Sequence, residues 1–282
     1  MKITKIRTAV GPIASAIRNA YISFSTMTIN LVAVETDVLR DGKPVVGYGF
    51  SSNGRYAQTA IIDERFIPRI MNADSADYAD EETELFDPRA VWSIFMSNEK
   101  PGGHGDRAHA AGALDMALWD VAAKVAEQPL WRLISDRFNG GKYDERVLVY
   151  PGGGYYYPGK ELDALKAEME GYREQGYTHV KMKIGGADLA LDLKRIEAVI
   201  GVVGGGKYLA VDANGYFDLN NALTYGRAME PDGLVWYEEA GDPLDYQLNA
   251  VQGEHYSGAL APRENLISLH DGPDAYTHLT LP

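Results

Sequence analysis

The chain has 282 residues, 45% of them apolar and 24% charged, which is the composition of an ordinary folded protein and excludes an intrinsically disordered one. Its formal net charge of -13 and pI near 4.9 argue against nucleic acid and anionic membranes as partners, because both are negatively charged. It contains no cysteine, so disulfides, thiolate metal sites and cysteine nucleophiles are excluded, and a metal would need oxygen or imidazole ligands. No apolar stretch approaches the roughly 20 residues of a membrane span. With no signal-peptide pattern at the N-terminus, we expect a cytoplasmic protein.

The first part of the chain predicts a small antiparallel sheet followed by helices. Alternating apolar residues predict three strands, at 2–10, 28–36 and 45–50. A helical period follows in three further segments, at 56–70, 88–97 and 107–126. We therefore expect residues 1–126 to form an α+β domain built on a three-stranded meander.

The second part of the chain, residues 127–282, alternates short apolar strands with helices. Strands are expected at 147–150, 179–184, 208–212, 234–238 and 258–262, with helices at 161–174, 189–199 and 219–229. This order implies a parallel sheet with right-handed crossovers, the α/β organisation of a (β/α) barrel. Because a closed barrel of this kind has eight strands, only about the first five are expected here.

Three carboxylates stand at the ends of consecutive predicted strands. Asp212, Glu238 and Glu264 are spaced by 26 and 26 residues, which is one βα unit each. In a barrel they would meet at the carboxyl-terminal rim, where barrel active sites form, and a cation would have to offset their repulsion. An all-oxygen site of this kind suits Mg²⁺. Each acid taken alone could instead cap the helix after its strand, but the equal spacing disfavours that explanation for all three.

Two lysines lie on one face of the strand that precedes these acids. Lys181 and Lys183 alternate with apolar residues, so both side chains are expected to point away from the helices. Two ammonium groups this close lower each other's pKa, which favours a base that works near neutral pH. A solvated sheet edge is the alternative, although a parallel strand is normally buried on both faces.

These motifs resemble the mandelate racemase group of the enolase superfamily. The resemblance rests on the Lys-x-Lys pair, the acids on the next three strands, and the segment Leu-Asp-Met-Ala-Leu-Trp-Asp at 114–120. Shorter stretches are similar to the D-tartrate dehydratases of that group, at 17–21, 52–56, 99–105, 153–159 and 238–243. The resemblance implies an enolase-type α+β capping domain followed by a (β/α)7β TIM-like barrel, of which this chain holds the N-terminal part.

The resemblance also implies a reaction. Lys183 would remove the proton α to a substrate carboxylate, with Lys181 adding charge beside that carboxylate and Mg²⁺ stabilising the ene-diolate. Asp212, Glu238 and Glu264 would bind the Mg²⁺. Substrate contacts are expected from Asn19, Asn53, Lys100, Tyr155 and Lys181. The expected enzyme is a lyase that dehydrates D-tartrate, or a closely related hydroxy diacid, to a 2-keto acid such as oxaloacetate.

Some of these assignments have alternatives. Asn19 and Asn53 could equally form turns, and Lys100 could be an ordinary surface charge. Three other functions stay open. The chain could be an acid-sugar dehydratase or racemase of the same superfamily, a fragment that only binds Mg²⁺ or a partner, or an aldolase-like barrel with a Schiff-base lysine.

Two features depart from the family pattern. Arg263 stands where glycine usually precedes the third metal ligand, and the histidine that serves as general acid near the seventh strand has no counterpart. We therefore expect no turnover by the 282-residue chain alone, and either poor solubility or a partner chain that completes the barrel. We also expect a homo-oligomer, and a small hydroxy diacid as the substrate.

Overall fold

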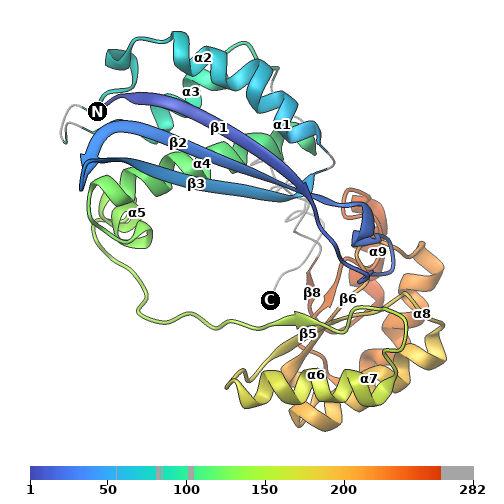
Figure 1. Ribbon diagram of the computed structural model, residues 1–282. Coiled ribbons are helices and arrows are strands. Elements are labelled where there is room, and N and C mark those ends of the chain that lie inside the picture. The colour runs from blue at the N-terminus through green and yellow to red at the C-terminus, as the bar shows by residue number, and fades with distance from the viewer. Residues whose placement is uncertain (55, 81–82, 84, 101–104, 262–282) are drawn as a thin grey trace. The chain divides into compact units, whose positions relative to one another are not determined.

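The computed structural model describes residues 1–54, 56–80, 83, 85–100 and 105–261 (Figure 1). The chain divides into two compact units. The first consists of Met1–Ala14 and Thr26–Arg146, and the second of Ser15–Ser25 and Val147–Pro282. No helix among the described residues is long and apolar enough to cross a bilayer.

The first unit is an antiparallel sheet packed against helices. The sheet has the order β1-β2-β3, formed by Ile3–Pro12, Thr28–Arg40 and Lys43–Gly54. The helices are α1 Ala57–Ile61, α2 Ile67–Asn72, α3 Pro88–Phe95, α4 Asp106–Val125 and α5 Leu130–Phe138, and a π-helical turn at Ile62–Phe66 joins α1 to α2. The three predicted strands and the meander are confirmed, whereas α5 was not predicted.

Helix α4 lies directly on the sheet because β3 presents glycines to it. A Cβ on Gly49 would stand 2.0 Å from the carbonyl oxygen of Ala113, and one on Gly47 would stand 2.1 Å from that of Ala117. Only glycine allows this approach. The core formed there joins β2 and α4 through buried apolar side chains such as Val34.

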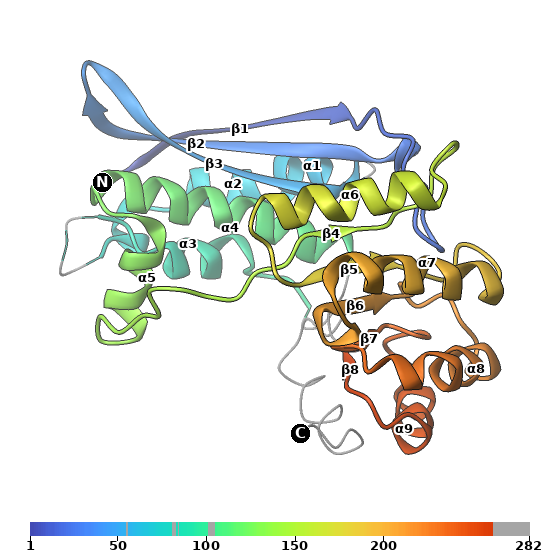
Figure 2. The same cartoon turned by 90° about the horizontal axis from the view of Figure 1, so that it is seen from below.

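The second unit is a parallel sheet with the order β4-β5-β6-β7-β8. Its strands are Gly152–Gly153, Val180–Lys183, Leu209–Asp212, Tyr237–Glu238 and Leu260–Ala261. Its helices are α6 Leu162–Glu174, α7 Leu189–Val203, α8 Leu219–Met229 and α9 Tyr246–His255, which lie along one side of the sheet (Figure 2). The expected fold class, a capping unit followed by five strands of a barrel-like sheet, is confirmed.

The first parallel strand lies later than predicted. Residues 147–150 are not part of a strand, and the first hydrogen bond from β5 meets the chain just after them, from the Lys181 amide to the Pro151 carbonyl at 3.0 Å. Val147 and Leu148 are 72% and 70% exposed. An apolar run becomes a strand only where a neighbour supplies ladder hydrogen bonds, and no described segment does so here.

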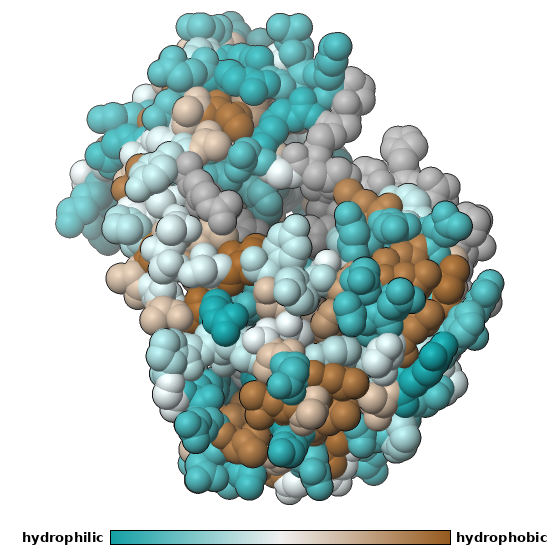
Figure 3. Space-filling model, turned by 90° about the vertical axis from the view of Figure 1, so that its right-hand side faces the viewer, coloured by the Kyte–Doolittle hydropathy of each residue, from teal (hydrophilic) through white to brown (hydrophobic). Residues whose placement is uncertain are grey.

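Apolar side chains also reach the surface elsewhere. Figure 3 shows one face of the molecule, on which patches of apolar residues lie among polar ones.

The segment Ser15–Ser25 belongs to the second unit although it comes early in the chain. Arg18 and Tyr156 exchange backbone hydrogen bonds of 2.9 and 2.8 Å, so this segment is fastened to the loop that follows β4. Phe24 adds an edge-on ring contact with Tyr155, at 5.9 Å between centroids. The segment therefore brings Asn19 into the unit that carries the parallel sheet.

Candidate active site at the ends of the parallel strands

The two predicted lysines and two of the three predicted acids meet at the carboxyl ends of three adjacent strands. Lys183 is paired in register with Asp212, and Asp212 with Glu238. Lys181 lies two residues before Lys183, on the same face of β5. Their apolar neighbours Val180, Met182 and Ile184 are buried in the core formed with the helices, as the alternation predicted.

Ion pairs connect these four side chains. The Lys183 Nζ lies 2.6 Å from the Asp212 Oδ2. The Lys181 Nζ lies 3.1 Å from that same oxygen and 2.6 Å from the Glu238 Oε1. Asp212 is fully buried, and the Lys183 side chain is 8% exposed. The cluster therefore holds two cations and two anions in a largely water-free site.

The carboxylates change the protonation expected for Lys181. Burial acts to lower the pKa of Lys181, but the nearby Asp212 and Glu238 carboxylates outweigh it and raise that pKa above its ordinary value. The mutual repulsion of Lys181 and Lys183, considered without the acids, predicted a lower pKa for these lysines. That expectation is wrong for Lys181 because it left out the two acids.

Each carboxylate is held in place by a second donor. The Asn214 backbone amide donates to the Asp212 Oδ1 at 2.8 Å, and the Trp236 Nε1 donates to the Glu238 Oε2 at 2.8 Å. Sequence reasoning did not single out Trp236. Its position two residues before Glu238, on the same strand face, was the available signal.

Helix capping does not account for these acids. Helix α8, after Asp212, is capped by Asp218, whose side chain accepts from the Asn221 amide at 2.8 Å. Helix α9, after Glu238, is capped by Asp245, which accepts from the Leu248 amide at 2.9 Å. The helices that follow Asp212 and Glu238 are therefore capped by other residues, Asp218 and Asp245.

The donor chemistry of the cluster fits Mg²⁺. Asp212 and Glu238 present carboxylate oxygens from neighbouring strand ends, and the Lys181 ammonium bonded to both shows that the pair accommodates a cation. Among the described residues, no three acidic or histidine side chains are arranged to hold a metal ion. Glu264, the third ligand predicted, lies outside the described residues.

Two predicted substrate contacts lie in the same unit. The Tyr155 ring centroid is 5.4 Å from the Lys183 Nζ, which places this ring beside the proposed base. Asn19 is buried, and its Oδ1 accepts from the backbone amides of Tyr21 and Ile22, at 2.8 and 2.6 Å. Asn19 thus forms the turn that was its alternative assignment, and its substrate contact stays a prediction.

The other two predicted contacts belong to the first unit. Asn53 lies in β3, and Lys100 is an exposed residue that follows Glu99. Glu99 itself is paired with three arginines, Arg65, Arg69 and Arg107. Positive charge is therefore concentrated near Lys100 in an otherwise acidic protein. The roles of Asn53 and Lys100 toward a substrate stay predictions.

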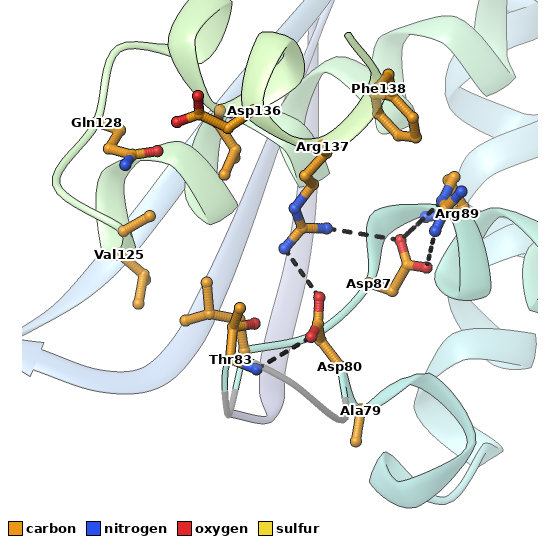
Figure 4. A pocket seen from close by; sticks show the side chains of 13 residues that line it. Ala79, Asp80, Thr83, Asp87, Arg89, Val125, Gln128, Asp136, Arg137 and Phe138 are labelled. Carbon is orange, nitrogen blue, oxygen red and sulfur yellow. Dashed lines mark hydrogen bonds and ion pairs between the residues drawn. The ribbon is translucent and has the colours of Figure 1, made fainter. Parts of the chain in front are cut away.

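A cavity of about 960 Å³ lies in the first unit (Figure 4). Arg137 points into it and pairs with Asp80 at 3.0 Å and with Asp87 at 3.8 Å. None of the predicted site residues lines it. Its charged groups are already paired with one another, so we assign it no catalytic role.

Two family models match the chain. Residues 2–135 match the mandelate racemase / muconate lactonizing enzyme N-terminal domain, and residues 164–277 match the enolase C-terminal domain-like family. The chain belongs to the mandelate racemase and muconate lactonizing group of the enolase superfamily.

Several of its relatives are named for acid sugars. A 3,6-anhydro-alpha-L-galactonate cycloisomerase from Streptomyces coelicolor is 32% identical over 86% of this chain and 63% of its own length. An arabinonate dehydratase from Saccharolobus solfataricus is 32% identical over 65% of this chain and 48% of its own. The crystal structure of L-talarate dehydratase from Polaromonas, complexed with Mg and L-glucarate, superposes with a TM-score of 0.73 at 27% identity, over 97% of this chain and 70% of that one. The chain thus spans about half to two thirds of the length of these curated relatives.

Proposed function

We propose that this chain carries the proton-abstracting part of an acid-sugar dehydratase or cycloisomerase, in which Lys183 removes the proton α to the substrate carboxylate. The observation that carries the proposal is the cluster of Lys181, Lys183, Asp212 and Glu238 at the ends of adjacent parallel strands. An aldolase-like Schiff-base lysine would give these acids no role.

Each side chain has a part in this proposal. A proton α to a carboxylate is very weakly acidic, so its removal requires a base in position and positive charge near the carboxylate. Lys183 would be the base, and its bond to Asp212 fixes the position of its Nζ. Lys181 would hold the substrate carboxylate by charge.

Asp212, Glu238 and, by the 26-residue spacing, Glu264 would hold the Mg²⁺. When bound, the metal supplies positive charge against the negative charge that develops on the substrate carboxylate. Trp236 and the Asn214 amide would orient the two described ligands toward it.

The acid-sugar class has better support than D-tartrate as the substrate, because the relatives named above are named for acid sugars. D-tartrate stays as the narrower candidate. Arabinonate carries one carboxylate, whereas glucarate and tartrate carry two. Lys100 would be the residue that meets a second carboxylate, since a lysine is a suitable point charge for one.

The test follows hydrogen exchange at the α carbon in D₂O by NMR, with Mg²⁺ present. A panel of aldonates, aldarates and D-tartrate would be offered to the wild type, to Lys183→Ala and to Lys166→Ala. Lys166 is an exposed lysine of α6 and provides a matched charge deletion. We expect exchange with at least one acid sugar, its loss in Lys183→Ala, and its retention in Lys166→Ala. Equal exchange in all three proteins would show that another group is the base.

A further inference from the structure

A buried ion pair of α7 lies behind the strand end that carries Lys183. Asp192 is fully buried and Arg195, one turn later, is 7% exposed. The Arg195 Nη1 lies 2.8 Å from the Asp192 Oδ1. Neither residue belongs to the cluster of lysines and acids described above.

Four donors satisfy the Asp192 carboxylate. Its Oδ1 accepts from the Tyr156 hydroxyl at 2.7 Å and from Arg195, and its Oδ2 accepts from the Gly185 amide at 2.7 Å and the Tyr225 hydroxyl at 3.2 Å. The Gly185 amide lies two residues after Lys183. Asp192 therefore anchors the loop that begins at the end of β5.

Arg195 anchors two strand ends at once. Its Nη1 donates to the Lys183 carbonyl at 3.2 Å and its Nη2 donates to the Gly154 carbonyl at 2.6 Å. The residue after Gly154 is Tyr155, whose ring lies beside the Lys183 Nζ. The guanidinium also stacks over the Tyr156 ring, at 4.0 Å from its centroid.

The Lys183 carbonyl needs these donors because the sheet ladder has ended. The Lys181 amide bonds to Pro151 of the neighbouring segment, so the peptide groups of Lys181 and Lys183 both face β4. Strand β4 ends at Gly153, and the chain turns away at Gly154 with a positive φ of 64°. A carbonyl buried beyond the ladder would otherwise be left without a partner. Arg195 donates to that carbonyl, and the Tyr156 hydroxyl oxygen lies against it at 3.4 Å while its one proton is shared with Asp192.

Stability alone is a weak reason to bury such a pair. Apolar side chains of similar size would often stabilise the core as well or better. Apolar side chains, however, could not donate hydrogen bonds to the Lys183 and Gly154 carbonyls.

We propose that Asp192, Arg195 and Tyr156 form a positioning group that fixes the backbone of Lys183 and Tyr155, and so sets where the Lys183 amine stands. This inference rests on the proposed function for the role of Lys183. None of the three side chains acts on the substrate itself. They act through the two strand ends to which they are bonded.

Two tyrosines supply a matched pair of variants. Each hydroxyl donates to Asp192, but the second contact of Tyr156 is the Lys183 carbonyl, whereas that of Tyr225 is the Ala187 carbonyl at 3.2 Å. Tyr156→Phe and Tyr225→Phe therefore delete the same group from the same carboxylate. Only the first also removes a polar contact to the carbonyl of the proposed base.

The first readout is the NMR signal of the Lys183 side chain in protein labelled with ¹³C and ¹⁵N lysine, assigned by its loss in Lys183→Arg. We expect Tyr156→Phe to shift this signal and Tyr225→Phe to leave it in place, with similar urea midpoints for both variants. The inference is overturned if the two variants shift the signal equally, or if neither shifts it.

The second readout is α-proton exchange. We expect kcat to fall about tenfold in Tyr156→Phe and to change less than about twofold in Tyr225→Phe, with KM within about twofold in both, because a small displacement of a base affects chemistry more than binding. If the wild type exchanges no acid at all, the proposed function fails. The lysine signal then still decides whether Tyr156 positions Lys183.

Discussion

Two buried carboxylates, one in each unit, are surrounded by different cations. Glu99 in the first unit has a side chain 3% exposed and pairs with Arg65, Arg69 and Arg107. Asp212 in the second unit is fully buried and pairs with two lysines. Arginine presents a planar fork of five donors that is always charged, whereas lysine is a compact point charge on a flexible stem.

The two ion-pair clusters therefore differ in role: the one around Glu99 is structural, and the one around Asp212 contains the residues proposed for catalysis. The Glu99 cluster fastens segments together, and Arg69 also donates to the Phe95 carbonyl at 2.7 Å. The cluster around Asp212 instead brings the lysine proposed as the base together with carboxylate oxygens of the kind that bind Mg²⁺.

The largest effect is expected from Lys183→Arg. This variant places a permanent positive charge beside Asp212 but replaces the amine proposed as the base with a guanidinium, which cannot be deprotonated in a protein. We expect α-proton exchange to fall about 10²–10⁴-fold, the usual contribution of a general base, with the urea midpoint nearly unchanged. Exchange at the wild-type rate would show that the identity of the cation does not matter here.

Asp212→Asn should weaken Mg²⁺ binding about 100-fold, because it removes a charged oxygen ligand. Isothermal titration of the chain with Mg²⁺ measures this. Asp218→Asn is the matched control, since it makes the same change at the cap of α8, six residues further on. An equal loss of Mg²⁺ affinity in both variants would show that Asp212 is not a metal ligand.

Glu99 should make the first unit sensitive to acid. Hydrogen bonds from Arg69 are the main cause that lowers the pKa of Glu99, to about 2, with Arg65 and Arg107 adding to it against the effect of burial. A carboxyl whose folded pKa is below its unfolded value stabilises the protein above about pH 4.5, and this contribution is lost as the pH falls toward 2. We expect about 1–2 kcal/mol, reduced because the arginines are partly exposed.

The measurement is urea unfolding of the wild type and Glu99→Gln between pH 3 and 7. The two proteins should differ most at neutral pH and converge in acid. A constant difference over this range would contradict the assignment.

The smallest effect is expected from Arg69→Lys. Lysine keeps the charge beside Glu99 but cannot donate in the same fixed geometry, so the free energy of unfolding should fall by less than about 1 kcal/mol. Chemical denaturation measures this. A larger loss than that of Glu99→Gln would mean that the Phe95 carbonyl, rather than Glu99, is the main partner of Arg69.

The sequence predicted those parts of the molecule that depend on local periodicity. Alternation in β5 predicted that Lys181 and Lys183 lie on the strand face opposite Val180 and Met182. The 26-residue spacing predicted that Asp212 and Glu238 lie at the ends of neighbouring strands. These relations follow from period two in a strand and from one βα unit per strand.

The parts that depend on tertiary packing could not be predicted in this way. Residues 147–150 have the pattern of a strand, yet a strand exists only where a neighbour completes its hydrogen bonds. The partners of Asp192 and Arg195 come from other elements and loops, up to 41 residues away in sequence. A charged pair at helical spacing predicts only a surface ion pair, and its burial becomes visible only in three dimensions.

The measurement that tests the central claim most directly is α-proton exchange with and without the metal. The wild-type chain would be incubated with an acid sugar in D₂O, first with a chelator and then with Mg²⁺ restored, and deuterium at the α carbon would be followed by NMR. The account predicts no exchange with the chelator and recovery on adding Mg²⁺. Exchange that continues at the same rate in the chelator would contradict a metal-assisted role for Asp212, Glu238 and Lys183.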